Sequence, residues 1–384
     1  MILKNALITT KDEQFLGYLE IDQTGKIKKI VKGHTEKVGI DCNNNILLPA
    51  FIDSHTHGGY GFSFNKINEI DFLTKFLKYK NNLHKKEGVA AVFGTTVTDT
   101  WKNIKLFTEK FNYLHKNYES FLLSWYLEGP FISKEKKGAH KQDLIISAKK
   151  QHLEYLKNHL NFKATIAIAP ENNVAKLLDK YQNDFDFTIG HSNCFNFSKT
   201  HKLTTYKRFT HFYNACSMFN QRQESLVNLI LENKLHKNFL VELIADGLHI
   251  RNSTLAFTLN MLDIDNICIV SDSLPEKGLK NGIYDLGPLK VEKKSDLFYI
   301  QNSSTIAGSG KGYNKILKNL KKNTNINWSQ LVKVSSYNVA QALNLTHLYG
   351  DIAENKPANI VLIDKNFNVI FSFINNKYFT NKKL

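Results

Sequence analysis

The 384-residue chain has few cysteines, and their spacing shows no pairing pattern. Its four cysteines, Cys42, Cys194, Cys216 and Cys268, form no Cys-x-x-Cys pair and no disulfide framework. We therefore expect reduced and mostly buried thiols. Cys194 and Cys216 lie close in sequence to histidines, but imidazole and carboxylate groups elsewhere are better partners for a bound cation.

Long apolar runs are also missing. No run approaches the roughly 18 residues that a transmembrane helix requires. The start, residues 1–6, leads into polar sequence and lacks the apolar middle of a signal peptide. Hydrophobic residues make up 42% of the chain and charged residues 22%, as in ordinary globular proteins. We expect a cytoplasmic protein without a membrane partner.

Acidic residues are fewer than basic ones, 35 against 51, so the formal net charge is +16. The lysines are scattered, however, and the dense cluster Lys134-Glu135-Lys136-Lys137 carries an acid among its bases. Without a basic stripe, nucleic-acid binding ranks last among the functions considered. Attraction of a small anionic substrate is the use of this charge that we favour.

Nucleotide-binding glycine motifs and internal repeats are absent too, which argues against a nucleotide-binding enzyme. What the chain does contain is an alternation of short apolar strands with amphipathic helices, which predicts parallel βαβ units. The predicted strands are 46–53, 89–97, 121–127, 163–169, 186–190, 207–211, 240–244 and 268–271, and predicted helices include 68–86, 145–159, 173–182 and 223–235. Eight strands fit a TIM-type (β/α)₈ barrel, with an open doubly wound sheet as the alternative.

Both ends of the chain are rich in short β-like stretches, unlike the middle. They occur at 6–10, 17–21 and 27–31, and again at 358–364 and 369–374. We predict that residues 1–46 and 350–384 together form a small β-sandwich domain. Residues 47–349 would then form the barrel.

Ionisable side chains recur where the predicted strands end. His55 and His57 end the first strand and, being two residues apart, project to the same face. Glu128, His191, His211 and Asp272 end four further strands. In a barrel these positions meet at one face, where charged groups are costly unless they are paired or bind metal. The pattern predicts a metal site.

The chain resembles the N-acetylglucosamine-6-phosphate deacetylases of the amidohydrolase superfamily over nearly its whole length. The order and spacing of seven segments carry the resemblance: LPAFIDSHTHG at 48–58, LEGPF at 127–131 with KGAH at 137–140, IAPE at 168–171, IGHS at 189–192, THFYNA at 210–215, IADGLH at 244–249 and VSD at 270–272. It implies a barrel with a β-sandwich built from both termini, in a homodimer.

The resemblance also implies roles for individual residues. The metal ligands would be Glu128, His191 and His211, with His55, His57 and Asp272 at a further position, for one or two divalent ions such as Zn, Fe or Mn. Asp272 would be the general base and His140 would polarise the substrate carbonyl. The substrate contacts would be His140, Asn214, Ala215, Arg222 and His249, with Arg222 reaching across the dimer interface.

The implied function is hydrolysis of N-acetylglucosamine 6-phosphate to glucosamine 6-phosphate and acetate in amino-sugar catabolism. Two alternatives stay open: deacetylation of N-acetylgalactosamine 6-phosphate, and a metal-binding but inactive structural or regulatory relative. Segment 218–221, before Arg222, departs from the family pattern. This departure bears on the sugar-phosphate contacts more than on the metal site.

Overall fold

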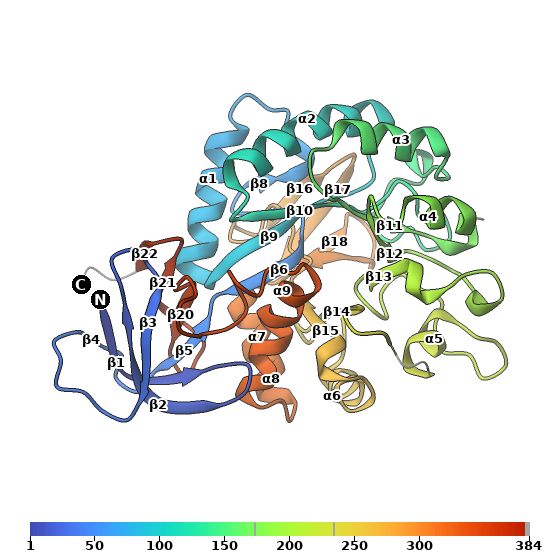
Figure 1. Cartoon of the computed structure of the whole chain (residues 1–384). Helices are drawn as coiled ribbons and strands as arrows, with labels where there is room; N and C mark the ends of the chain where they lie inside the picture. Colours follow the sequence, from blue (N-terminus) through green and yellow to red (C-terminus); the bar gives the residue numbers. More distant parts are fainter. Residues whose placement is uncertain (173, 233–234, 381–384) are drawn as a thin grey trace.

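The computed structural model describes residues 1–172, 174–232 and 235–380, and its centre is a barrel of parallel strands (Figure 1). The eight strands follow one another around the sheet in chain order. They are β6 Phe51–Thr56, β9 Val89–Thr96, β10 Leu122–Leu127, β11 Thr165–Ile168, β12 Asp186–Ile189, β13 Tyr206–Phe209, β14 Leu240–Ile244 and β15 Ile267–Val270. The predicted TIM-type barrel is confirmed.

Strands such as β9, β14 and β15 are buried on both faces, which explains why they are near-continuous apolar runs. The first and last strands, β6 and β15, come together where they end. The Asp272 N–H donates to the carbonyl of His55 at 3.0 Å, and the His57 N–H donates to that of Ser273 at 2.9 Å. These bonds nearly close the barrel by joining the carboxyl ends of β6 and β15.

Helices cover the outside of the barrel (Figure 1). The longest, α2, buries Ile104, Phe107, Phe111 and Leu114, which recur every three to four residues and so form one face. The α-helices are α1 Phe72–Asn82, α2 Trp101–Tyr118, α3 Lys150–His159, α4 Ala175–Tyr181, α5 Leu226–Glu232, α6 Asn252–Met261, α7 Tyr313–Asn323, α8 Trp328–Val332 and α9 Asn338–Ala342. Parts of two predicted helices, residues 173 and 233–234, lie outside the described residues.

Strands from both ends of the chain form a second sheet, at the left of Figure 1. It contains β1 Ile2–Thr9, β2 Gln14–Ile21, β3 Ile27–Lys32, β4 Ile40–Asp41, β5 Ile46–Pro49, β20 Ile360–Ile363, β21 Val369–Ile374 and β22 Lys377–Thr380. The antiparallel pair β5–β20 joins the two ends. This confirms a β-rich unit built from both termini. Residues 381–384 lie outside the described residues, and the domain boundaries stay a prediction.

One feature was not predicted: an antiparallel four-stranded sheet inserted after β15. Its strands are β16 Gly282–Leu286, β17 Leu289–Lys294, β18 Leu297–Ile300 and β19 Ile306–Ser309, and a two-stranded ladder of β7 Gly58–Gly59 and β8 Phe62–Ser63 follows β6. The Ser309 N–H donates to the carbonyl of Asp272 at 2.9 Å. The inserted sheet is thus attached beside the carboxyl ends of the barrel strands.

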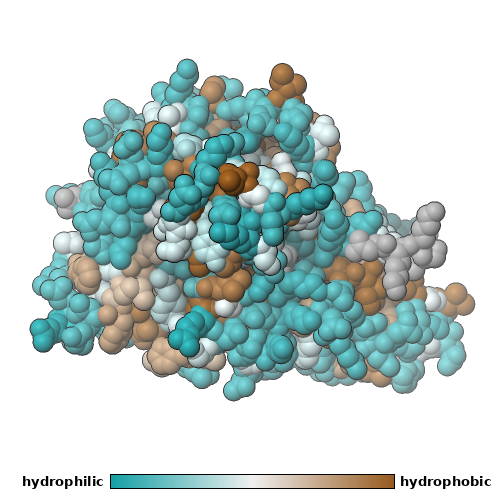
Figure 2. Space-filling model, turned by 180° about the vertical axis from the view of Figure 1, so that it is seen from behind, coloured by the Kyte–Doolittle hydropathy of each residue, from teal (hydrophilic) through white to brown (hydrophobic). Residues whose placement is uncertain are grey.

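The surface seen from behind is mainly hydrophilic, with hydrophobic residues in small separate groups (Figure 2). The lysines form ion pairs with nearby acids at many places, for example Lys157 with Asp184 and Lys333 with Asp265. Among the described residues, we find no helix with the length and apolar character needed to cross a membrane.

Candidate metal centre and active-site pocket

Seven ionisable side chains meet at the carboxyl ends of the barrel strands. All are at least 90% buried: His55, His57, Glu128, His140, His191, His211 and Asp272. His191, His211 and Asp272 have positive φ angles of 47°, 26° and 48°. Left-handed backbone is strained for such residues and persists where the surrounding structure fixes it, most often at functional sites. The sequence-predicted ligands are therefore brought together at strained strand ends.

Glu128 lies at the centre of this cluster. Its Oε1 atom is 2.9 Å from His211 Nε2 and 3.1 Å from His191 Nε2, and these two nitrogens are 3.0 Å apart. Its Oε2 atom is 3.2 Å from His57 Nε2. Glu128 thus contacts imidazoles from both sides of the cluster.

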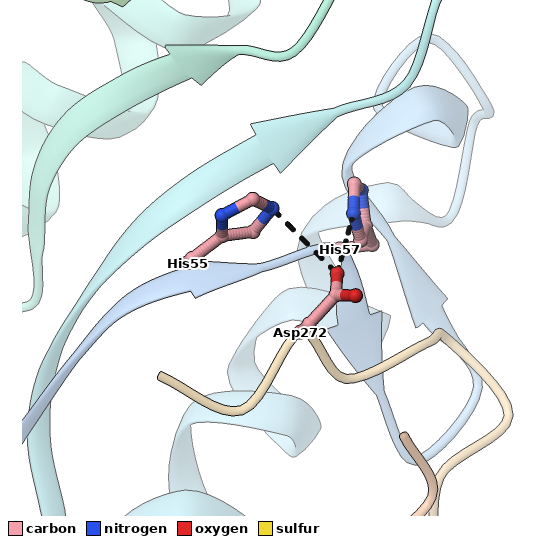
Figure 3. Close-up of side chains that lie close together, drawn as sticks. All are labelled: His55, His57 and Asp272. Carbon is pink, nitrogen blue, oxygen red and sulfur yellow. Dashed lines mark hydrogen bonds and ion pairs between the residues drawn. The ribbon is translucent and has the colours of Figure 1, made fainter. Parts of the chain in front are cut away.

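His55, His57 and Asp272 form the second part of the cluster (Figure 3). Asp272 Oδ1 lies 3.1 Å from His57 Nε2 and 3.6 Å from His55 Nε2. All three side chains point toward one another from the ends of β6 and β15. The ligand atoms are close enough together to bind one ion.

Two histidines are held by partners on their outer nitrogens. His55 Nδ1 is 2.9 Å from the Glu242 carboxylate, and His191 Nδ1 is 2.8 Å from the Lys136 carbonyl. Both partners accept hydrogen bonds, so each Nδ1 carries a proton, and in the neutral ring each Nε2 can present a lone pair to a cation in the cluster. Metal-binding histidines in proteins are oriented in this way.

His140 has the opposite arrangement. Its Nδ1 accepts hydrogen bonds from the Thr98 N–H at 3.1 Å, and the Thr98 hydroxyl lies 2.7 Å away. In the neutral ring the proton is therefore on Nε2, which points toward Glu128 at 3.6 Å. His140 can donate a hydrogen bond into the cluster but has no free lone pair there. It differs in this from His191, with which it and Glu128 form a compact group.

The cluster fits a divalent cation. His55 Nε2 is buried and has no hydrogen-bond partner among the described residues, a costly state unless a cation binds it. The other inward-facing atoms are imidazole nitrogens and carboxylate oxygens, a donor set that suits Zn, Fe or Mn. These residues can therefore hold a divalent metal.

The charges in the cluster are strongly coupled to one another. Burial alone would raise the pKa of Glu128, but His55 and hydrogen bonds from His140 and His191 hold it well below its usual range. Burial likewise opposes ionisation of Asp272, yet His57 and His55 keep its pKa low. Burial, reinforced by His191, lowers the pKa of His140 to about 4. The two carboxylates are therefore ionised and His140 is neutral near pH 7.

A pocket of about 460 Å³ opens over the cluster. The predicted substrate contacts Asn214, Ala215 and His249 line it, as do His140 and Asp272. His249 is oriented by Asp246, whose Oδ2 lies 2.8 Å from its Nδ1. Arg222 is exposed and does not line this pocket within its own chain. Its predicted role depends on a second subunit and stays a prediction.

Several residues of the site were missed from the sequence. Glu242, which contacts His55, lies inside the apolar strand β14, and a charge within such a run is a signal that could have found it. Thr98 gave no comparable signal. Residues 304–307 of the inserted sheet line the pocket, and nothing in their sequence indicated contact with the barrel.

Comparisons with known proteins agree with this architecture. A model of the amidohydrolase family matches residues 228–382. N-acetylglucosamine-6-phosphate deacetylase from Lysinibacillus sphaericus is 28% identical over 378 residues, which cover 95% of this chain and 94% of that protein. The crystal structure of the Thermotoga maritima N-acetylglucosamine-6-phosphate deacetylase is 30% identical, with a TM-score of 0.84 and coverage of 98% of this chain and 99% of that one.

A more distant structure supports the fold alone. An N-acetyl-D-glucosamine-6-phosphate deacetylase mutant from Mycobacterium smegmatis, in complex with N-acetyl-D-glucosamine-6-phosphate, is 20% identical to this chain. Its TM-score is 0.88, and the match covers 98% of both chains. The similarity therefore extends over the barrel and the sheet formed by the two ends.

Proposed function

The chain belongs to the N-acetylglucosamine-6-phosphate deacetylase family, and we propose that it hydrolyses N-acetylglucosamine 6-phosphate to glucosamine 6-phosphate and acetate. The observation that carries this proposal is the composition of the pocket. Asp272 and His140, a proton acceptor and a hydrogen-bond donor, line the same cavity as the metal-binding cluster around Glu128. Holding a metal would not require His140, whose Nδ1 is occupied by Thr98 and whose Nε2 carries the proton, and this disfavours an inactive relative.

We propose that Glu128, His191 and His211 hold one divalent cation, and that His55, His57 and Asp272 hold a second. A bound cation lowers the pKa of a water molecule towards about 7 and withdraws charge from the acetyl oxygen. The protein itself supplies proton transfer and a hydrogen bond to the acetyl oxygen.

Asp272 is the general base in this proposal. Its low pKa keeps it ionised and able to accept a proton from the attacking water. The water oxygen bonds to the acetyl carbon, the C–N bond breaks, and Asp272 returns the proton to the leaving amine. His140 Nε2–H donates a hydrogen bond to the acetyl oxygen as negative charge develops there, an effect worth roughly 3–4 kcal/mol in comparable sites.

Acetate release from N-acetylglucosamine 6-phosphate by the metal-loaded protein tests the activity. Asp272→Asn should lower kcat by roughly 100-fold or more, because it removes the proton acceptor. The metal content of the same sample shows whether the fall in kcat comes from the missing proton acceptor or from loss of metal. Asp285→Asn, on the inserted sheet and not itself among the residues that line the pocket, serves as the control and should retain parental kcat. Parental turnover in Asp272→Asn would contradict the mechanism.

The same assay distinguishes the alternative functions. Faster turnover of N-acetylgalactosamine 6-phosphate would keep the mechanism and change the substrate. No turnover of either sugar phosphate by protein that contains metal would favour the inactive relative. We expect the glucosamine epimer to be preferred, because this activity is the one named for the relatives that match the chain from end to end.

The number of cations is a separate question. With a second cation position at His55, His57 and Asp272, His55→Gln should bind one ion fewer than the parent while retaining deacetylase activity. Metal analysis of the purified proteins measures this directly. An unchanged ion count in the variant would contradict a second position.

We also propose that the enzyme is a homodimer in which Arg222 completes the partner's pocket. Arg222 is exposed beside Met218 and Phe219, which are 53% and 62% exposed, and apolar surface of this kind is typical of an interface. Light scattering of the purified protein measures the assembly, and a monomer would contradict the proposal. A cytoplasmic location stays a prediction.

A further inference from the structure

Lys136 is a basic residue of the active-site pocket to which no role has been given above. It is half-buried, and among the residues that line the pocket in the described part of the chain it is the one lysine, with no arginine beside it. The other ionisable groups that line the pocket are histidines and the carboxylates Glu128, Glu135 and Asp272. Lys136 is therefore the permanent positive charge that this chain itself brings to the pocket wall.

The position of Lys136 is fixed by the metal centre. Its carbonyl accepts a hydrogen bond from His191 Nδ1 at 2.8 Å, so the backbone at Lys136 cannot move independently of a predicted metal ligand. Gly138, two residues further along the chain, also packs closely against His191. A Cβ atom there would lie 3.1 Å from His191 Cε1 and 3.9 Å from Ala215 Cβ. The loop that carries Lys136 thus lies against the segment that holds the predicted substrate contacts.

The charge of Lys136 is free to meet a ligand. Its neighbour Glu135 is engaged elsewhere, because Glu135 Oε2 accepts a hydrogen bond from Asn193 Nδ2 at 2.6 Å. No ion pair or side-chain hydrogen bond of Lys136 is found among the described residues. Its ammonium group acts on the Cys216 thiol, opposing the burial that raises the pKa of this thiol to about 12. Cys216 directly follows Ala215, which lines the same pocket as Lys136.

We propose that Lys136 binds the phosphate of the sugar-phosphate substrate and selects for phosphorylated sugars. The inference rests on the proposed function. An ammonium group that no protein acid neutralises is suited to a dianion, and a half-buried position limits its screening by water. Lys136 also shares the pocket wall with Asn214 and Ala215, so the phosphate would lie between them and the lysine. The subunit's own lysine would thereby retain part of the phosphate affinity when Arg222 is not in place.

Kinetics of metal-loaded Lys136→Met on two sugars test this role. For N-acetylglucosamine 6-phosphate we expect KM to rise on the order of tenfold, as for loss of a charged hydrogen bond, with kcat within about twofold of the parent. For unphosphorylated N-acetylglucosamine we expect kcat/KM to stay at the parental value. Lys136→Arg should restore most of the affinity. Lys134→Met, exposed on the same loop and outside the pocket, should match the parent on both sugars.

Binding of inorganic phosphate provides a readout that does not depend on turnover. Calorimetry should show weaker binding in Lys136→Met than in the parent and in Lys134→Met. An equal fall in kcat/KM on both sugars, together with reduced metal content, would show that Lys136 acts only by orienting His191. This result would overturn the inference. So would unchanged KM and unchanged phosphate binding. If the parent itself releases no acetate from the phosphorylated sugar, the proposed function fails instead.

Discussion

At the scale of single residues, the chemistry of the site depends on which ring nitrogen of each histidine carries the proton. His191 donates from Nδ1 to a carbonyl, whereas His140 accepts at Nδ1 from a backbone N–H. These two neighbouring imidazoles, 4.5 Å apart between ring centres, therefore present opposite groups to the pocket. One offers a lone pair to a cation and the other offers a proton to an oxygen. Residue identity alone could not distinguish them.

Glu242 tests the importance of such outer partners. It is fully buried, lies 2.9 Å from His55 Nδ1, and accepts from the His211 N–H at 3.2 Å. Glu242→Gln should preserve its shape but weaken the orientation of both histidines, and we expect metal affinity to fall by roughly 10- to 100-fold. Competition with a chromophoric chelator measures this affinity.

The half-buried acid Glu292 on the inserted sheet offers a control. Glu292→Gln should bind metal like the parent, since this residue lies away from the cluster. Because Arg208 Nη1 is 3.4 Å from Glu242 and is also buried, Glu242→Gln should in addition lower stability. Parental metal affinity in the folded variant would show that His55 is oriented by packing alone.

At the scale of elements, the strand ends were predictable and the inserted sheet was not. Most buried barrel strands are continuous apolar runs, so the residue at which such a strand ends is visible in the sequence, as at Asp272 after β15. The strands β16–β19 alternate weakly between apolar and polar residues on an exposed surface, and such segments resemble loops. Most of the site residues that the sequence did not reveal lie in segments of this loop-like kind. Thr98 reaches His140, and residues 304–307 reach the pocket, through tertiary placement, which no local pattern encodes.

The last strand of the insert, β19, is attached directly to Asp272, the proposed general base, through the Ser309 N–H. Gly308 has a φ of 157°, and a Cβ atom there would lie 2.8 Å from the Leu274 side chain and 2.9 Å from the Asp272 carbonyl. Gly308→Ala should therefore displace Asp272 and lower kcat by roughly 10- to 100-fold, since small misplacements of catalytic groups are costly. Gly282→Ala, in the same insert, meets no atom closer than 3.5 Å and should leave kcat unchanged. Steady-state kinetics at saturating metal distinguish the two, and similar kcat values would contradict the coupling.

At the scale of the whole molecule, the barrel and the sheet formed by the two ends are joined by buried contacts. His84 lies between them. Its ring packs on Phe121, next to β10, and on Phe379 of β22, while its carbonyl accepts a hydrogen bond from Ser372 of β21 at 2.7 Å. His84 Nδ1–H donates a hydrogen bond to the Val89 carbonyl at 2.8 Å. An ionisable group, the His84 imidazole, is thus enclosed where the two units meet.

This contact should make the protein sensitive to acid. Burial lowers the pKa of His84 to about 4, against about 6.5 in an unfolded chain. The unfolded state therefore binds the proton first, so the contribution of His84 is complete above pH 6.5 and is lost as the pH falls from 6.5 towards 4. Between pH 7.5 and 5 this loss amounts to about 2 kcal/mol of unfolding free energy.

Urea unfolding of the parent, His84→Gln and the exposed-site control His347→Gln at these two pH values measures the effect. His84→Gln should be less stable at pH 7.5, because it disturbs a packed contact, but should lose about 2 kcal/mol less than the parent on going to pH 5. His347→Gln should follow the parent. The test compares the change in unfolding free energy between pH 7.5 and pH 5, rather than the stability at either pH. Other groups of the fold titrate equally in all three proteins and so cancel in this comparison. Equal losses in parent and His84→Gln would show that His84 is protonated without opening the contact between the two units.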